Sequence, residues 1–173
     1  LALGRPVSLL LSSSTQAELD NPYGRSKRQA EEVVKAYAEE SGARAIVYRL
    51  TNVFGKWCRP NYNSVVATFC HSIARDLPIT ISNPDHVMDL VHVDDVVRCF
   101  IAELAADGPA GTGYRQAEPT YRITLAALAD QIRAFRNMRQ SLLIPDFADP
   151  FTHKLYSTYL SYLETDDFAY DLE

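Results

Sequence analysis

Short apolar runs alternate with longer amphipathic stretches along the chain. The apolar runs are bounded by turn-forming residues, which is typical of buried strands, and they cover residues 6–11, 45–50, 79–81 and 90–93. The longer stretches repeat apolar residues at steps of three and four, which is the spacing of one helix face. They predict helices over residues 23–41, after Asn63, after Asp94 or Asp95, after Thr124, and over residues 151–163. Strands that alternate with helices in this way predict an α/β fold.

Polar residues and glycines mark the predicted ends of these elements. Asn63 and Thr124 can each cap the first turn of a helix, and Gly42 can end the first helix. Residues 108–113 are rich in glycine and proline and predict a flexible joint. The apolar stripes expected to face the core are Val65, Val66, Phe69 and Ile73 in the second helix, Val97, Ile101 and Leu104 in the third, and Leu125, Leu128, Ile132 and Phe135 in the fourth.

Charge and composition exclude several classes of partner. A chain of 173 residues fits one domain, and its formal net charge of -5 disfavours nucleic acid, because phosphate contacts need a surplus of lysine and arginine. No apolar run approaches the roughly 20 residues of a membrane-spanning helix. The three cysteines are an odd number without a CxxC pair, which favours reduced thiols over disulfides or a metal site. We therefore expect a cytoplasmic protein with no membrane segment, no nucleic-acid partner and no metal.

The strongest chemical signal is the pair Tyr23 and Lys27, at the start of the first predicted helix. Residues four apart lie on one helix face, so the phenol and the ammonium project together. An ammonium one turn away favours the phenolate and brings the phenol pKa from about 10 towards working pH, as a general acid or base requires. The serines that end the first apolar run, Ser12, Ser13 and Ser14, could then hold a reacting carbonyl by a hydrogen bond. This arrangement predicts proton transfer to or from a sugar or alcohol oxygen.

Further segments follow this pair in a characteristic order. They are RLTNVFG over residues 49–55, Asn63 with the helix after it, LPITI over 77–81 and DLVHVDD over 89–95. Together with the serine string and NPYGRSK, they resemble the extended short-chain dehydrogenase/reductase family, also described as NAD-dependent epimerases and dehydratases. The strings GKWCRPNYNSVVATFC and KLYSTYLSYL more narrowly resemble bacterial UDP-sugar 4-ketoreductases of capsule and O-antigen synthesis, on the route to UDP-N-acetyl-L-fucosamine, which carry a C-terminal cupin domain.

The resemblance assigns roles to particular residues. It implies that Tyr23 donates a proton, that Lys27 tunes Tyr23 and holds the cofactor ribose, and that Ser14 polarises the carbonyl, with Ser12 and Ser13 as alternatives. It also implies a nicotinamide cofactor, NADP or NAD, and a UDP-sugar substrate. The residues expected near the cofactor are Tyr23, Lys27, Leu50 and Asn52, and those expected near the substrate are Asn52, Arg59 and Asn63.

The glycine-rich G-x-x-G-x-x-G segment of the family does not occur in this sequence. We therefore expect residues 1–173 to be a single domain that is itself a fragment. The resemblance implies the C-terminal part of a Rossmann-like, doubly wound parallel sheet with a small substrate-binding subdomain. The N-terminal cofactor-binding half and the following cupin domain would lie outside this chain, which alone would be inactive. The resemblance also implies a homodimer.

The expected activity is reduction of a 4-keto group on a UDP-linked 6-deoxy-N-acetylhexosamine. Family dehydratases carry an acidic pair where this chain has Thr15 and Gln16, which leaves reduction or epimerisation. Met88 stands where most of the family has an arginine for the diphosphate, and Arg59 is a candidate to replace it. The alternatives are a nucleotide-sugar epimerase of the same family and a non-catalytic scaffold or interface module.

Overall fold

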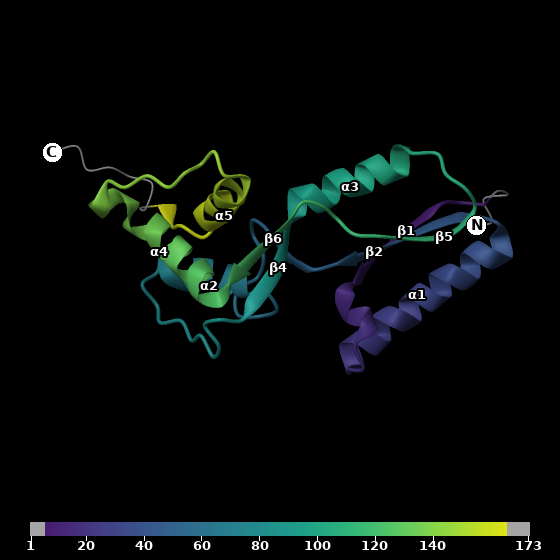
Figure 1. The fold of residues 1–173 in the computed structure, drawn as a ribbon, viewed down its shortest axis with the longest axis horizontal. Coiled ribbons are helices and arrows are strands. Elements are labelled where there is room, and N and C mark those ends of the chain that lie inside the picture. Colours follow the sequence, from purple (N-terminus) through teal and green to yellow (C-terminus); the bar gives the residue numbers. More distant parts are fainter. Residues whose placement is uncertain (1–5, 166–173) are drawn as a thin grey trace. The chain divides into compact units, whose positions relative to one another are not determined.

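The computed structural model describes residues 6–165, without the side chains of residues 139 and 140, and the chain forms two compact units (Figure 1). Over the described residues, the first unit is residues 6–51 with Asp94–Thr120, and the second is Asn52–Val93 with residues 121–165. Each unit therefore combines segments that are distant in the sequence. Within the described part of the chain, no helix is long and apolar enough to span a bilayer.

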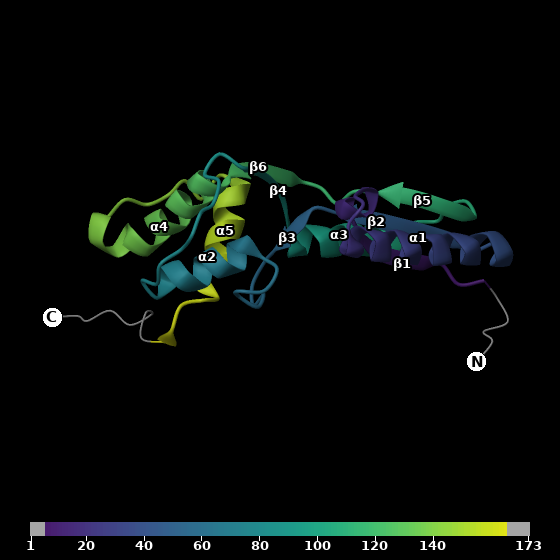
Figure 2. The same ribbon diagram turned by 90° about the horizontal axis from the view of Figure 1, so that it is seen from below.

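A parallel sheet organises the first unit. Its strands are β1 (Leu9–Ser14), β2 (Arg44–Leu50) and β5 (Gly111–Arg115), in the order β1-β2-β5, and Ser14 is in register with Leu50. Helices α1 (Pro22–Ser41) and α3 (Val93–Ala105) lie on opposite faces of this sheet (Figures 1 and 2). Parallel strands with helices on both faces confirm the predicted α/β class.

Local signals explain why α1 forms where it was predicted. The Asn21 side chain accepts a hydrogen bond from the Gly24 N–H at 2.7 Å, and Pro22 occupies the first helical turn. Gly42 ends the helix with a φ of 67°, a backbone conformation that glycine adopts without a Cβ clash. Both ends of the helix are therefore encoded in adjacent residues.

Helix α3 packs on β2 through a face other than the one expected. The Tyr48 and Phe100 rings lie 4.8 Å apart, and Arg44 forms an ion pair with Glu103. Tyr48 also donates a hydrogen bond to Glu103 at 3.2 Å, and burial together with the Glu103 charge raises the pKa of Tyr48 to about 12. The predicted inward face was wrong, because its side chains are exposed: Val97 to 47%, Ile101 to 63% and Leu104 to 65%.

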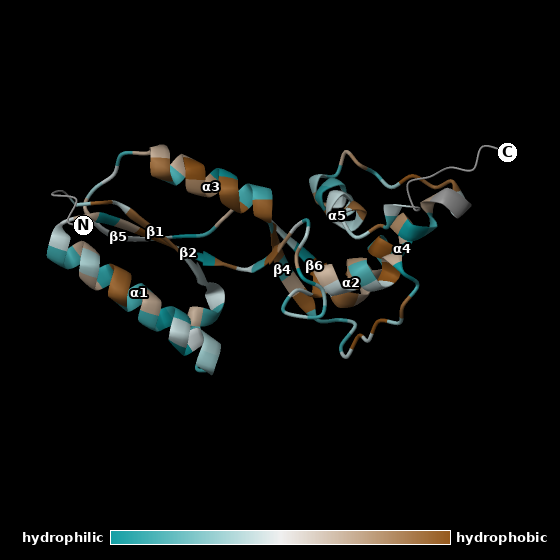
Figure 3. Cartoon of the chain, turned by 180° about the vertical axis from the view of Figure 1, so that it is seen from behind, coloured by the Kyte–Doolittle hydropathy of each residue, from teal (hydrophilic) through white to brown (hydrophobic). Residues whose placement is uncertain are grey.

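The second unit has its own sheet and apolar core. Its strands are β3 (Asn52–Phe54), β4 (Val87–His92) and β6 (Thr120–Thr124), in the order β3-β4-β6. Its helices are α2 (Val65–Ala74), α4 (Leu125–Ser141) and α5 (Pro150–Leu160). The three helices pack on one another, and apolar residues, brown in Figure 3, make up much of α2. The predicted stripes are confirmed at these buried positions: Val66, Phe69, Ile73, Leu128, Ile132 and Phe135.

Several predicted boundaries were wrong. The first strand begins at Leu9 and includes all three serines, because these residues pair with β2. Residues 79–81 form no strand, although Ile79 and Ile81 pack against the core of the second unit. Residues 108–113 are not a joint, since strand β5 begins at Gly111 and pairs with β2. Ser64, rather than Asn63, caps α2 by accepting a hydrogen bond from Ala67 N–H at 3.3 Å.

Candidate functional site

Tyr23 and Lys27 lie together in the first turns of α1. The Lys27 Nζ atom is 5.6 Å from the centroid of the Tyr23 ring, and it donates a long hydrogen bond of 3.5 Å to the Ser12 carbonyl. Tyr23 is 49% exposed, so a ligand in solvent can reach its hydroxyl. The helix thus presents a phenol and an ammonium on one face, beside the end of strand β1, as the spacing predicted.

The three serines of β1 have different partners. Ser13 is buried and donates a hydrogen bond of 2.5 Å to Glu31. Ser14 caps the short helix over Thr15–Glu18, because its Oγ accepts from the Gln16 N–H at 3.2 Å. An oxygen that accepts in this way leaves the Ser14 hydroxyl proton able to donate to a substrate. Among the three serines, Ser13 is thus committed to a buried contact within the unit.

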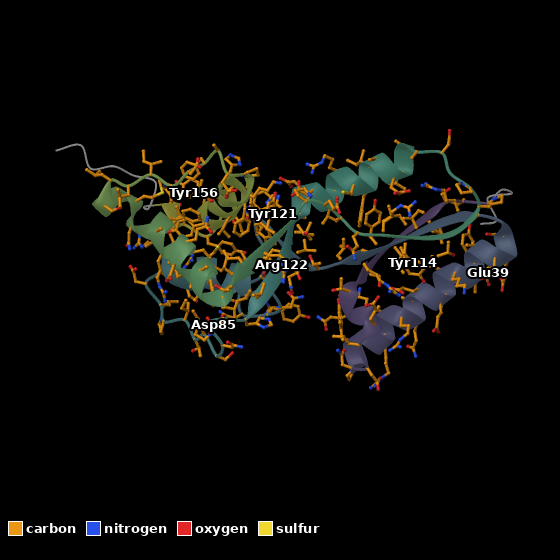
Figure 4. The ribbon with its side chains drawn as sticks, in the orientation of Figure 1. Glu39, Asp85, Tyr114, Tyr121, Arg122 and Tyr156 are labelled. Atoms are coloured by element: carbon orange, nitrogen blue, oxygen red, sulfur yellow. The ribbon has the colours of Figure 1, made fainter. Side chains whose placement is uncertain are left out.

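A buried ion pair between Glu31 and Arg49 joins α1 to the sheet. Glu31 is 2% exposed, and its carboxylate accepts from Arg49 Nε at 3.1 Å and Nη2 at 2.7 Å. Arg49 also pairs with Glu18 at 2.7 Å and lies 4.8 Å from the ring centroid of Tyr114, which is labelled in Figure 4. Burial raises the pKa of Glu31, but the hydrogen bonds from Arg49 and Ser13 and the Arg49 charge outweigh it and leave the pKa below its usual value.

Glu31 was not among the site residues predicted from the sequence. The residue lies four positions after Lys27 and eight after Tyr23, so all three belong to one helix face. An acidic residue on a face that continues into apolar Val34 and Ala38 was the available signal. Its partners Ser13 and Arg49 come from two different strands, which no local pattern could have identified.

The second unit holds the predicted substrate residues. Asn52 begins β3, and its Nδ2 donates to the Asp89 carbonyl at 3.1 Å. The Asp89 carboxylate pairs with Arg122 at 3.2 Å; Arg122, labelled in Figure 4, belongs to β6. Asn63 is exposed and does not cap α2, so its amide can contact a ligand.

The predicted residues fall into two groups. The first unit holds Ser14, Tyr23, Lys27 and the buried Leu50 at the end of β2, while the second holds Asn52, Arg59 and Asn63.

The cysteines are free thiols, and burial raises the pKa of Cys70 far above its usual value. Over the described residues, no group of three or more histidine, cysteine or acidic side chains is placed to hold a metal ion.

Comparisons with known proteins point to one family. Residues 9–115 match the model of the NAD dependent epimerase/dehydratase family. A Pseudomonas aeruginosa protein, UDP-2-acetamido-2,6-beta-L-arabino-hexul-4-ose reductase, is 50% identical over 98% of this chain and 45% of its own length. The chain thus spans about half the length of this relative.

Solved structures show the same fold. The capsular polysaccharide assembling protein CapF from Staphylococcus aureus matches 96% of this chain and 46% of its own, with a TM-score of 0.88 and 42% identity. UDP-glucose 4-epimerase from Thermus thermophilus, solved with NAD, matches 90% of this chain and 63% of its own, with a TM-score of 0.69 and 17% identity. At that identity the second match supports the fold alone, which is the Rossmann-like α/β fold expected.

Proposed function

The chain belongs to the NAD dependent epimerase/dehydratase family, and we propose that it is part of an enzyme that reduces a 4-keto group on a UDP-linked 6-deoxy-N-acetylhexosamine. The observation that carries the proposal is the Tyr23–Lys27 pair beside the serine-bearing end of β1. A phenol, an ammonium and a hydroxyl are the donors that reduction of a carbonyl to an alcohol requires. The 50% identical relative that is named as a reductase of this type of sugar supports it.

In the proposed mechanism, Tyr23 protonates the oxygen of the sugar carbonyl as its carbon is reduced. The Ser14 hydroxyl donates to the same oxygen and stabilises the charge that develops there. Lys27 stabilises the negative charge left on the Tyr23 oxygen and contacts the cofactor ribose. Leu50 and Asn52 would line the cofactor, and Asn52, Arg59 and Asn63 would contact the nucleotide sugar.

The cofactor proposed is a nicotinamide dinucleotide, NADP rather than NAD, which supplies the hydride when bound. The donor set fits this group, because Lys27 and Tyr23 present an ammonium and a hydroxyl that can bond ribose hydroxyls. We propose that most of the cofactor is bound by an N-terminal half of the same domain. Two observations support this: β1 is the outer strand of its sheet among the described residues, and the chain covers about half the length of its relatives.

We also propose how the complete enzyme extends beyond this chain. A cupin domain after this chain and a homodimer would complete the enzyme. Met88 packs against the core of the second unit, so we propose that Arg59 meets the diphosphate in its place.

The test uses the whole protein that carries this chain, with NADPH and a UDP-linked 4-keto-6-deoxy-N-acetylhexosamine. Net loss of NADPH absorbance, in proportion to the hydroxy sugar formed, is the expected result. Turnover of a nucleotide sugar without added cofactor would instead support the epimerase. Normal assembly and pathway flux with a Tyr23→Phe protein would support the scaffold.

Gly24 offers a test of how precisely Tyr23 must be held. A Cβ at Gly24 would lie 2.2 Å from the Gln16 carbonyl oxygen and 2.5 Å from that of Leu19, both backbone atoms of the turn before α1. Gly24→Ala must therefore displace the start of α1, and we expect turnover to fall at least about 10-fold, because small misplacements of a catalytic group are costly. The measurement is kcat in the NADPH assay.

Gly42→Ala is the matched control at the other end of α1. Its positive φ of 67° makes alanine unfavourable by about 1 kcal/mol, yet among the described residues no atom beyond the chain neighbours lies within 4 Å of the added Cβ. It should lower stability while leaving kcat within twofold. Equal losses of turnover in the two variants would mean that general destabilisation, and not the position of Tyr23, explains the effect.

A further inference from the structure

Arg49 of β2 lies between two carboxylates that belong to different elements. Its Nε and Nη2 atoms donate to Glu31 of α1, and its Nη1 atom donates to Glu18 of the short helix η1 (Thr15–Glu18) at 2.7 Å. The guanidinium also lies 4.8 Å from the ring centroid of Tyr114 on the neighbouring strand β5. Because a guanidinium is planar and rigid, it fixes the two carboxylates relative to each other. We refer to Glu18, Arg49 and Glu31 as the Arg49 bridge.

Each end of the Arg49 bridge leads to a residue of the proposed catalytic site. Glu31 lies on α1 about two turns after Tyr23. Glu18 is the last residue of η1, and Ser14 caps the start of that helix by accepting from the Gln16 N–H at 3.2 Å. Strand pairing with β2 already fixes the backbone of Ser14, so the direction of its hydroxyl depends on η1. The bridge therefore connects the serine hydroxyl to the helix that carries the tyrosine.

The short helix η1 needs contacts outside itself to stay in place. It is a single turn of four residues, and an isolated turn is unstable because fixing its backbone costs more free energy than its hydrogen bonds contribute. Ala17 is buried, and Arg28 of α1 donates a hydrogen bond of 3.3 Å to the Leu19 carbonyl. Of the side chains of η1, all of which the structure describes, only Glu18 forms a hydrogen bond with β2. Glu18 thus holds η1 against the sheet.

The stability of the fold does not explain the contact between Glu18 and Arg49. The Glu18 side chain is 70% exposed, whereas that of Glu31, at the other end of the bridge, is 3% exposed. An exposed ion pair contributes only about 0–1 kcal/mol to the free energy of unfolding. Catalytic groups, in contrast, must be held to within about 0.5 Å of their working positions. A contact that adds little stability but fixes η1 therefore acts mainly on the direction of the Ser14 hydroxyl.

We propose that the Arg49 bridge positions the Ser14 hydroxyl relative to the Tyr23 hydroxyl. Arg49 acts through Glu18 and η1 and directs the serine at the carbonyl oxygen that the tyrosine protonates. This inference rests on the proposed function, in which both hydroxyls donate to one oxygen, and it adds three residues that act without contacting the substrate. When the bridge is broken, the substrate still binds but one of its two donors is misdirected, so the loss falls on kcat and not on KM.

The experiment measures kcat and KM of bridge variants of the whole protein in the NADPH assay. Glu18→Ala changes an exposed residue, and we expect kcat to fall about 10-fold while KM stays within about threefold. Glu18→Gln keeps an oxygen that can accept from Arg49, so it should restore most of the lost turnover. Arg49→Lys keeps a cation that cannot bridge both carboxylates, and it should lose about as much as Glu18→Ala. The double variant should lose little more than either single variant, because both changes break one contact.

Asp20→Ala is the matched control, because Asp20 is an exposed carboxylate two residues after Glu18 that pairs with Arg25 at 2.8 Å. It should leave kcat within about twofold, since neither partner contacts the bridge. A second measurement, hydrogen exchange of residues 14–19 followed by mass spectrometry, uses neither NADPH nor substrate. Exchange should be faster in Glu18→Ala and Arg49→Lys than in the wild type, and unchanged in Asp20→Ala.

The two measurements separate a failure of this inference from a failure of the proposed function. If the wild-type protein reduces no 4-keto sugar, the proposed function is wrong, and the exchange of residues 14–19 still decides whether the Arg49 bridge holds η1. The inference is overturned if Glu18→Ala keeps the wild-type kcat, or if exchange over these residues does not change. Losses that add fully in the double variant would overturn it too, because Glu18 and Arg49 would then act separately.

Discussion

Replacement of Tyr23 by phenylalanine in the whole protein is expected to lower kcat at least about 100-fold, because general acid catalysis contributes roughly 10²–10⁴. The variant loses one hydroxyl from a half-exposed side chain, so the fold and the affinity for the nucleotide sugar should change little. A loss confined to turnover is the sign of a group that acts only in the transition state. The measurement is steady-state kcat and KM in the NADPH assay.

Two companion variants show whether the effect belongs to the Tyr23 hydroxyl. Tyr37→Phe removes a hydroxyl from the same helix, one that donates to the Val7 carbonyl at 2.9 Å, and it should leave kcat within twofold. Lys27→Ala should lower kcat and also weaken cofactor binding, because its ammonium is assigned both tasks. If Tyr23→Phe keeps near-normal turnover, the proton comes from another group and the proposed mechanism is wrong.

The sequence predicted those elements whose signals are local. Helix α1 has its cap, its proline and its terminal glycine within its own residues, so its bounds were nearly correct. Strands β3 and β6 are short and gain their stability from pairing with β4. They contain no run of apolar residues from which the sequence could have predicted them. Helix α3 carries apolar residues on two neighbouring stripes, and only contact with Tyr48 decides which stripe is inward.

The residues of the candidate site also differ in whether a local sequence signal or a long-range contact brings them together. Tyr23 and Lys27 are four residues apart, so their proximity follows from helix geometry alone. The partners of Glu31 lie 18 residues away on either side, on strands that meet only in the folded sheet. For the same reason, the sequence could not separate Ser13, which Glu31 engages, from its neighbours Ser12 and Ser14.

Glu31 is therefore a position where a single change should cost much stability. Glu31→Ala leaves Arg49 partly buried without its main partner, and removal of one member of a buried pair destabilises by about 3 kcal/mol or more. Since Arg49 keeps Glu18 and is itself 26% exposed, we expect the lower end of that range. The measurement is hydrogen exchange of the α1 and β1 amides in the whole protein, which reports the free energy of local opening.

The dependence on pH identifies the charge of Glu31 as the cause. The pKa of Glu31 is lowered in the folded state, so its ionised form stabilises the fold above the ordinary carboxyl pKa of about 4.3, and this contribution is lost as the pH falls through the lowered value. Glu31→Gln should therefore differ most from the wild type near neutral pH and least in acid. The control is Glu39→Gln, labelled in Figure 4 on the same helix, whose exposed pair with Lys35 should contribute less than about 0.5 kcal/mol at any pH. A Glu31→Gln difference that stays constant from neutral pH into acid would show that packing, and not the ion pair with Arg49, joins α1 to the sheet.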